Sequence, residues 1–278
     1  MGAKDVKKPE VVGKGAIATR EQQEQAVGAP REASRPRGLE EMDREDFVIP
    51  RLQIAQKMSP EIDAQSPMHM DNLKEGDLFN TVTREIYGKS VMVIPLKFMK
   101  SRVLFNPRES GGGIRCVSAN GIDGGTESPT CDVCPHSRWG TGKQGRGQAC
   151  TNFKNVASLI VHKDGHLDLI SVSMKSTAIK VSKRWATLMN LRSASAKTEK
   201  DRDIFSGIYT VKTVPQKNAQ GSFFNYDVDN AKVAKADEAQ YAFALGMYET
   251  LGVRKVQVDM SGLDHGDVGG GDDASQEM

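Results

Sequence analysis

The stretch NFKNVASLIVHKDGHLDLISVSM, residues 152–174, carries the pattern from which the fold is predicted. Two runs rich in Val, Ile and Leu, 154–162 and 167–174, are separated by Lys-Asp-Gly-His at 163–166. The Asp-Gly pair supplies the positive φ that a tight hairpin turn requires. We therefore expect two adjacent antiparallel strands here.

The apolar runs on either side of this hairpin predict a small barrel. Upstream, VMVIPLKFMKSRVLF predicts a strand over 91–105, and downstream an apolar stripe at helical spacing predicts a helix over 177–191. Two further runs, 204–214 and 222–228, predict strands. Three strands, a helix and two strands follow one another in an OB-fold. We predict a mainly β, α+β fold with an OB-fold-like five-stranded barrel, although other small barrels and α+β domains share this order.

Charge and composition divide the chain into three parts. Residues 1–38 lack aromatic residues and hold eight Lys or Arg against five acids, which predicts a disordered N-terminal arm. Residues 257–278 are rich in Gly and hold six acids without Lys or Arg, which predicts a disordered acidic tail. The domain is expected at 39–256, with flanking helices such as the one predicted over 236–251. The net charge of +2 therefore hides a basic body and an acidic end.

All four cysteines fall in one segment, 116–150, that is inserted between the first two predicted barrel strands. They are Cys116, Cys131, Cys134 and Cys150. A Cys-x-x-Cys knuckle supplies two ligands from one turn, and tetrahedral zinc needs four such ligands. We predict a zinc-binding insert whose Zn²⁺ is structural, because four thiolates leave no open coordination position. Disulfides, a redox Cys-x-x-Cys and unrelated free thiols are the alternatives, and His136 could replace one cysteine.

The chain lacks the common catalytic signatures. It contains no GxxxxGK[ST], no GxSxG and no HExxH. His162 and His166 flank the predicted turn and are interpreted as surface residues in preference to a metal pair. No apolar run approaches the length of a membrane span, and no segment resembles a signal peptide. We therefore expect a soluble, cytoplasmic protein that is not an enzyme.

Basic and aromatic residues are interleaved along the predicted barrel and its insert. Cations follow phosphates through counterion release, and aromatic faces stack on unpaired bases, so this mixture is typical of single-stranded nucleic-acid binding. Burial in the barrel core is the alternative for the aromatic residues, above all for Phe98, Tyr209 and Trp185. The predicted contact residues are Lys97, Lys100, Arg102, Arg138, Trp139, Lys143, Arg146, Lys154, Tyr209, Lys212, Phe223 and Phe224.

The chain resembles the single-stranded DNA-binding proteins of bacteriophages. The likeness lies in the barrel order, the cysteine insert, the basic and aromatic faces and the acidic tail, over residues 45–256 and the tail. The runs DFVIPRLQIAQKMSPE and GDLFNTVTREIYGKSVMVIPLKF are also similar to phage proteins of this kind. The T-even phage family holds its zinc with three Cys and one His, whereas four Cys are available here. The T-odd phage family ends in an aromatic residue, whereas this chain ends in Met278.

The resemblance implies a protein that coats and protects unwound single-stranded DNA during phage replication or recombination, in the cytoplasm of the bacterial host. Its expected partners are single-stranded DNA, replication or recombination proteins recruited by the acidic tail, and further copies of itself on DNA. Two alternatives remain open. One is a zinc-containing phage transcription or host-takeover factor that acts by protein contact, and the other is a nuclease or recombination enzyme.

Overall fold

The computed structural model describes residues 41, 47–107, 110–218, 221–253 and 257–258. The chain divides into two units, 1–43 and 44–278, and the fold below is that of the second unit. The predicted disordered arm lies outside the described residues, as does the predicted tail beyond Val258. The first two residues of that tail, Gln257 and Val258, form a strand instead, because they pair with residues 48 and 49.

The second unit consists mainly of strands, with helices between and after them. The strands are β1 (Val48–Ile49), β2 (Arg51–Ile54), β3 (Leu78–Asn80), β4 (Ile86–Gly88), β5 (Ser90–Phe105), β6 (Ile114–Ser118), β7 (Thr151–Val161), β8 (Leu167–Lys175), β9 (Gly207–Asn218), β10 (Gly221–Lys235) and β11 (Gln257–Val258). The helices are α2 (Ile179–Ser195), α3 (Glu199–Arg202) and α4 (Glu238–Val253), with 3-10 turns η3 (Pro135–Ser137), η4 (Lys143–Gly145), η5 (Ser176–Ala178) and η6 (Ile204–Ser206).

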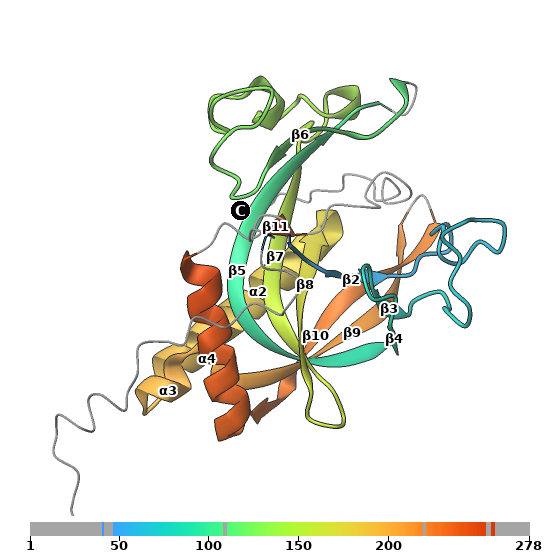
Figure 1. The fold of residues 1–278 in the computed structure, drawn as a ribbon. Helices are drawn as coiled ribbons and strands as arrows, with labels where there is room; N and C mark the ends of the chain where they lie inside the picture. Colours follow the sequence, from blue (N-terminus) through green and yellow to red (C-terminus); the bar gives the residue numbers. More distant parts are fainter. Residues whose placement is uncertain (1–40, 42–46, 108–109, 219–220, 254–256, 259–278) are drawn as a thin grey trace, which may run out of the picture. The chain divides into compact units, whose positions relative to one another are not determined.

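One sheet curls into a half-barrel, with the strand order β10-β9-β5-β7-β8-β2-β3-β4 and with β6 paired to β5 (Figure 1). The long strand β5 makes this curl possible. Its residues 90–93 pair with β9, whereas residues 93–103 pair with β7. The register between β5 and β7 shifts between Pro95 and Lys97, and such a bulge lets a strand bend.

The predicted mainly β, α+β class is confirmed as a barrel-like fold. The five predicted strands correspond to β5, β7, β8, β9 and β10, and the two predicted helices correspond to α2 and α4. β6 is not predicted, because IRCVS is short and follows three glycines. It forms because the end of β5 extends beyond the barrel and offers a partner, with Val103 opposite Val117.

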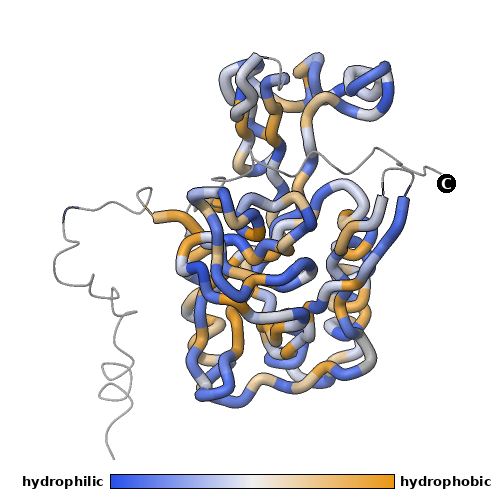
Figure 2. Tube along the Cα trace, turned by 90° about the vertical axis from the view of Figure 1, so that its right-hand side faces the viewer, coloured by the Kyte–Doolittle hydropathy of each residue, from blue (hydrophilic) through white to orange (hydrophobic). Residues whose placement is uncertain are grey.

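Two apolar clusters hold the sheet and the helices together. In the first, Trp185 of α2 is fully buried and meets Phe98 and Tyr209 edge to face, each with its ring centroid 5.8 Å away. The second packs α4 on β5 and β7 through residues that include Leu96 and Ala244. In Figure 2 hydrophobic segments run through this body, whereas the loops of the insert are mostly hydrophilic or pale. Core burial is therefore the correct alternative for Trp185 and Tyr209.

Candidate nucleic-acid interface

An open cavity of about 310 Å³ lies between β2, the end of β8 and β10. Here β2 is inserted beside β8 in parallel, with Arg51 opposite Ser171 and Leu52 opposite Val172. The lining includes three aromatic rings besides Tyr226, and its charged residues are all cations. The three rings are those of Phe153, Phe223 and Phe224, and the cations are Arg51, Lys57 and Lys175.

Gln56 bridges this cavity from the segment after β2 to the backbone of β10. Its amide Nε2 donates to the Phe224 carbonyl at 2.8 Å, and its Oε1 accepts from the Phe224 N–H at 2.9 Å. A neighbouring strand would make the same pair of hydrogen bonds to this residue. The Tyr226 hydroxyl adds a third connection by donating to the Leu52 carbonyl at 2.5 Å. The two sides of the cavity are therefore joined through side chains.

The ring of Phe224 is held in place from two further sides. Gly76 has a φ of +85°, and a Cβ at this position would stand 2.6 Å from the Phe224 ring, so only glycine fits. Lys89 Nζ lies 4.8 Å from the ring centroid, within cation–π range. Phe223, the next residue, is half-buried at the cavity wall. Two half-buried rings of successive residues in β10 therefore line the cavity, and the ring of Phe224 is held from two sides.

A basic cluster lies on β5, β7 and α2. Lys100 is the register partner of Lys154 across the β5–β7 ladder. The pKa of Lys154 is lowered, first by burial and then by the nearby charges of Lys100, Lys183 and Arg102. Arg102 also reaches the insert, since its Nη1 donates to the Cys131 carbonyl at 3.4 Å. Four cations are thus concentrated where the insert meets the barrel, and an anion bound there would relieve their repulsion.

The other predicted contact residues separate into two groups. Four of them are exposed on the insert: Arg138, Trp139, Lys143 and Arg146. Three have structural partners elsewhere. Lys97 donates to the Leu251 carbonyl of α4 at 3.2 Å. Tyr209 is only 2 % exposed and accepts from Arg192. Lys212 pairs with Asp227 at 3.4 Å. Because these contacts occupy or bury the three side chains, the interface proposed below omits them.

Sequence reasoning did not select Arg51, Gln56, Lys57, Phe153, Lys175 or Lys183, which also belong to this surface. The signal for Lys175 and Lys183 was present, because 175–192 contains five basic residues and no acid. Nothing in the sequence singles out Gln56, whose role depends on the approach of a strand 168 positions away.

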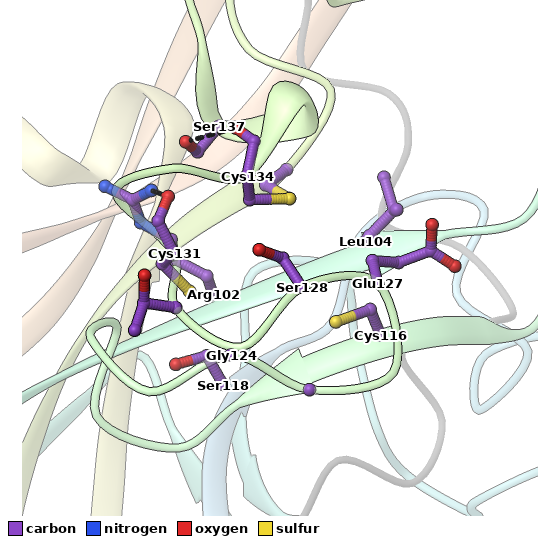
Figure 3. A pocket seen from close by; sticks show the side chains of 13 residues that line it. Arg102, Leu104, Cys116, Ser118, Gly124, Glu127, Ser128, Cys131, Cys134 and Ser137 are labelled. Atoms are coloured by element: carbon purple, nitrogen blue, oxygen red, sulfur yellow. Dashed lines mark hydrogen bonds between the residues drawn. The ribbon is translucent and has the colours of Figure 1, made fainter.

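The four cysteines line one narrow cavity in the insert (Figure 3). They come from different segments, since Cys116 lies on β6, Cys131 and Cys134 form the knuckle, and Cys150 precedes β7. The cavity has a volume of about 10 Å³, which is roughly the room for one water-sized occupant. All four are free thiols, and no three of their sulfur atoms lie within 4.8 Å of one another in the described chain. The thiols therefore converge without a closed tetrahedral shell.

The surroundings of the cysteines bear on the choice of ligands. Burial, together with the charges of the other three cysteines, raises the pKa of Cys150 to about 11. His136 instead faces Glu127, with 3.4 Å between Nε2 and Oε2, and Glu127 forms two hydrogen bonds with Arg115. This contact gives His136 a partner of its own, and His136 does not line the cavity, whereas all four cysteines do.

Together these features define a barrel-like α+β protein with an aromatic, basic cavity and a cysteine-bearing insert. Residues 20–257 match the family model described as Pam3 phage gp34-like protein, and the chain belongs to this family. As the resemblance predicted, it is a phage protein. No curated protein and no solved structure matches the chain. Within the part of the chain that the structure describes, no helix is long and apolar enough to cross a membrane.

Proposed function

We propose that this phage protein binds single-stranded DNA, with little sequence preference, and protects unwound strands during replication or recombination. The observation that carries the proposal is the open cavity between β2 and β10, whose lining combines aromatic rings with cations and contains no carboxylate. Each stacked base contributes roughly 1–3 kcal/mol, and cations along the backbone add a salt-dependent term.

An OB-like barrel is the fold that we propose for this function. β5 pairs with β7 and β9, β7 pairs with β8, and β9 pairs with β10, while α2 lies between the third and fourth of these strands. These pairings and the helix position support an OB-like arrangement. The pair that would close the barrel, between β8 and β10, is replaced by β2 and the Gln56 bridge. The proposed binding cavity lies at this replacement.

The proposed DNA path runs from the cavity to the basic cluster and the insert. Phe223 would stack on a base, and Lys175 would contact a phosphate beside it. Lys154 follows Phe153 directly in β7, and successive side chains of a strand point to opposite faces, so the path would cross from one face of β7 to the other at this point. Arg102 connects this cluster to the insert. The exposed Trp139 and its basic neighbours would form the far wall of the path.

We also propose that the four cysteines hold one structural Zn²⁺. Four thiols around a cavity of single-atom size form the donor set of a structural zinc site, and such a site has no open coordination position. The ion would close the loops of the insert on one another and so keep Arg138 and Trp139 in position. The acidic tail lies outside the described residues, and recruitment of partner proteins by it is proposed from its charge alone.

Titration of the full chain with fluorescent dT oligomers tests the proposed function. We expect tight binding that weakens steeply with salt, and far weaker binding to duplex DNA of the same length. Phe223→Ala should reduce affinity about 5- to 150-fold, equivalent to roughly 1–3 kcal/mol for one lost stacking contact. Phe243→Ala is the matched control, because Phe243 is exposed on α4, outside the cavity lining.

Two outcomes would contradict the proposal. Equal affinity for duplex and single strand would exclude stacking on unpaired bases as the source of binding. Equal effects of the Phe223 and Phe243 substitutions would show that the cavity has no special part in it. Cleavage of the oligomers in the presence of Mg²⁺ would indicate an enzyme instead.

A further inference from the structure

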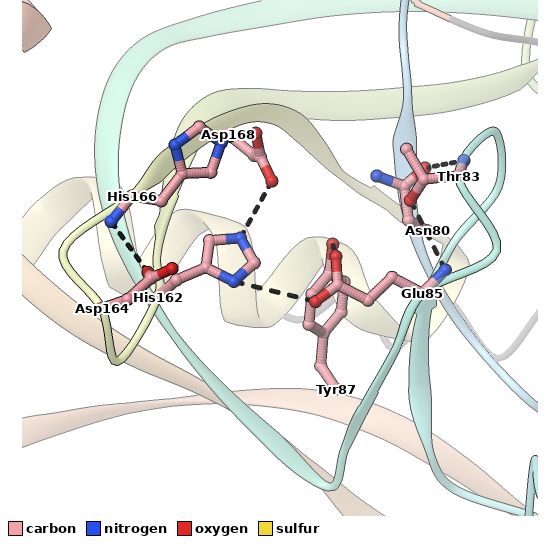
Figure 4. A network of polar contacts seen from close by, with 8 residues as sticks. All are labelled: Asn80, Thr83, Glu85, Tyr87, His162, Asp164, His166 and Asp168. Atoms are coloured by element: carbon pink, nitrogen blue, oxygen red, sulfur yellow. Dashed lines mark hydrogen bonds and ion pairs between the residues drawn. The ribbon is translucent and has the colours of Figure 1, made fainter.

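A cluster of histidines and carboxylates lies at the β7–β8 turn, outside the proposed DNA path (Figure 4). His162 Nε2 is 2.9 Å from one oxygen of Asp168, and His166 Nε2 is 2.9 Å from the other. On its opposite side, His162 Nδ1 is 3.7 Å from Glu85 Oε1, which belongs to the segment before β4. Two separate parts of the chain therefore meet at His162.

The surrounding contacts fix these side chains in place. The His162 N–H donates to the His166 carbonyl at 3.0 Å, and the His166 N–H donates to Asp164 Oδ1 at 3.0 Å. Gly165, with a φ of +87°, permits the tight turn between them. From the other side, the Tyr87 hydroxyl donates to Glu85 Oε2 at 3.3 Å, and the Tyr87 ring lies edge-on to His162. The cluster is thus supported by hydrogen bonds around it.

The chemistry of this cluster is that of a metal site. Within the described residues, Glu85, His162 and Asp168 alone bring three potential ligand atoms within 4.8 Å of one another. None of the ion pairs of the described chain joins Lys or Arg to either carboxylate. Imidazole nitrogen with carboxylate oxygen is a donor set for divalent ions such as Mn²⁺ and Zn²⁺. An isolated histidine–carboxylate contact, such as that between His69 and Asp71 at 3.6 Å, offers only two ligands.

We propose that Glu85, His162 and Asp168 bind one divalent transition-metal ion. His166 acts as a positioning residue, because it holds the second oxygen of Asp168, and Tyr87 does the same for Glu85. Because His162 Nε2 faces Asp168 and Nδ1 faces Glu85, metal binding requires one of these two contacts to open so that a single ring nitrogen and both carboxylates face the ion. Bond lengths of about 2.0–2.2 Å then bring the three ligand atoms closer together than 4.8 Å. Three protein ligands leave further coordination positions for water. The bound ion would fasten the β7–β8 turn to the segment before β4, independently of DNA binding.

Manganese separates this site from the cysteine cluster, because Mn²⁺ prefers oxygen and nitrogen ligands whereas thiolates select softer ions. Electron paramagnetic resonance of free Mn²⁺ gives the affinity of the full chain, and amide line broadening gives the location. We expect one saturable site, with broadening centred on residues 85–87 and 161–168. Asp168→Asn should lower the affinity at least about tenfold, and His162→Ala should abolish saturable binding.

His69→Ala is the matched control and should leave Mn²⁺ affinity unchanged. Circular dichroism of each variant establishes that the fold is intact, and Asp168→Asn keeps the side-chain shape if His162→Ala does not fold. Three results would overturn the proposal: no saturable Mn²⁺ binding, broadening centred elsewhere, or an affinity that Asp168→Asn does not change. DNA affinity should not respond to either variant, so this test fails or succeeds separately from the proposed function.

Discussion

Lys154 lies opposite Lys100 and close to Arg102 and Lys183. Burial and these like charges lower its pKa, which means that the folded state disfavours the charged form. A base with a lowered folded-state pKa opposes folding at every pH below that pKa, and its disadvantage disappears only above the unperturbed value of 10.5. The residue that we propose as a phosphate contact is therefore a stability cost to the free protein.

Replacing Lys154 with Met tests this trade-off. At pH 7 we expect Tm to rise by a few degrees, because the repulsion is removed, while affinity for dT oligomers falls. The slope of log affinity against log salt should decrease by about 0.7, the value for one lost contact to a single strand. As pH rises towards 10.5, the difference in Tm between variant and wild type should shrink.

Lys197→Met serves as the control for this experiment, because Lys197 is an exposed lysine in the loop after α2. It should change neither Tm nor the salt slope. A Lys154→Met protein with a lower Tm, or with an unchanged slope, would contradict the proposed role of Lys154.

The insert of residues 116–150 depends little on apolar packing. Among the described residues, the apolar cluster nearest the insert consists of Val103, Phe105, Ile114 and Phe153, which lie on the strands that flank it. No residue between Cys116 and Cys150 belongs to any of the apolar clusters of the described chain. Hydrogen bonds such as Thr141 Oγ1 to the Arg138 carbonyl, at 2.7 Å, hold the loop locally. A small module without a core usually requires a metal or disulfides. Its order should therefore depend on the proposed zinc.

Chelation tests the insert as a unit. The purified chain should contain about one zinc per molecule, and its removal should lower dT affinity about tenfold while the main thermal transition moves little, because the barrel has its own core. Cys134→Ser should reproduce this effect, and Val133→Ala is the neighbouring control, because Val133 is exposed and does not line the cysteine cavity. Limited proteolysis should cut first within 116–150 after chelation. If chelation left the dT affinity unchanged, the insert would have only a structural role and no part in DNA binding.

Prediction from sequence succeeds for elements whose signal is local. The five long apolar strands and both helices follow from patterns within one segment, such as the Asp-Gly turn of the β7–β8 hairpin. It fails where distant segments meet. The parallel pairing of Arg51 with Ser171 creates the cavity, yet nothing in the sequence around either residue predicts this pairing. The same holds for Glu85, which meets His162 only because two turns approach each other in space.

At the scale of the whole molecule, one seam of the curled sheet, between β2 and β10, is bridged by side chains and not by a ladder. Gln56 contributes both hydrogen bonds to Phe224 that a strand would contribute, and no ladder joins β2 to β10 in the described chain. This seam is weaker than a ladder, because two side-chain bonds replace a row of backbone bonds. It is also the place where a cavity can open beside Phe223.

Gln56→Ala should loosen this seam. Each hydrogen bond contributes about 0.5–1.5 kcal/mol net, so we expect a loss of roughly 1–3 kcal/mol in the free energy of unfolding. Hydrogen exchange at the Phe224 amide should accelerate more than the loss of global stability explains. Exchange within the β5–β7 ladder should accelerate only by the amount that this loss explains. Gln56→Glu keeps the acceptor and should preserve part of the protection, and Gln65→Ala, in an exposed turn, should have no effect. Unchanged exchange at Phe224 would contradict the bridge.

The parallel pair β1–β11 brings the first and last strands of the described body together. Val48 lies opposite Gln257 and Ile49 opposite Val258, and both Ile49 and Val258 are buried. A body whose ends meet in this way is nearly circular in its connectivity. Residues 258 and 47 could be joined by a short linker and the chain opened at the exposed loop 196–198, with every strand pairing kept. The barrel would then be specified by its pairings and not by where its chain starts.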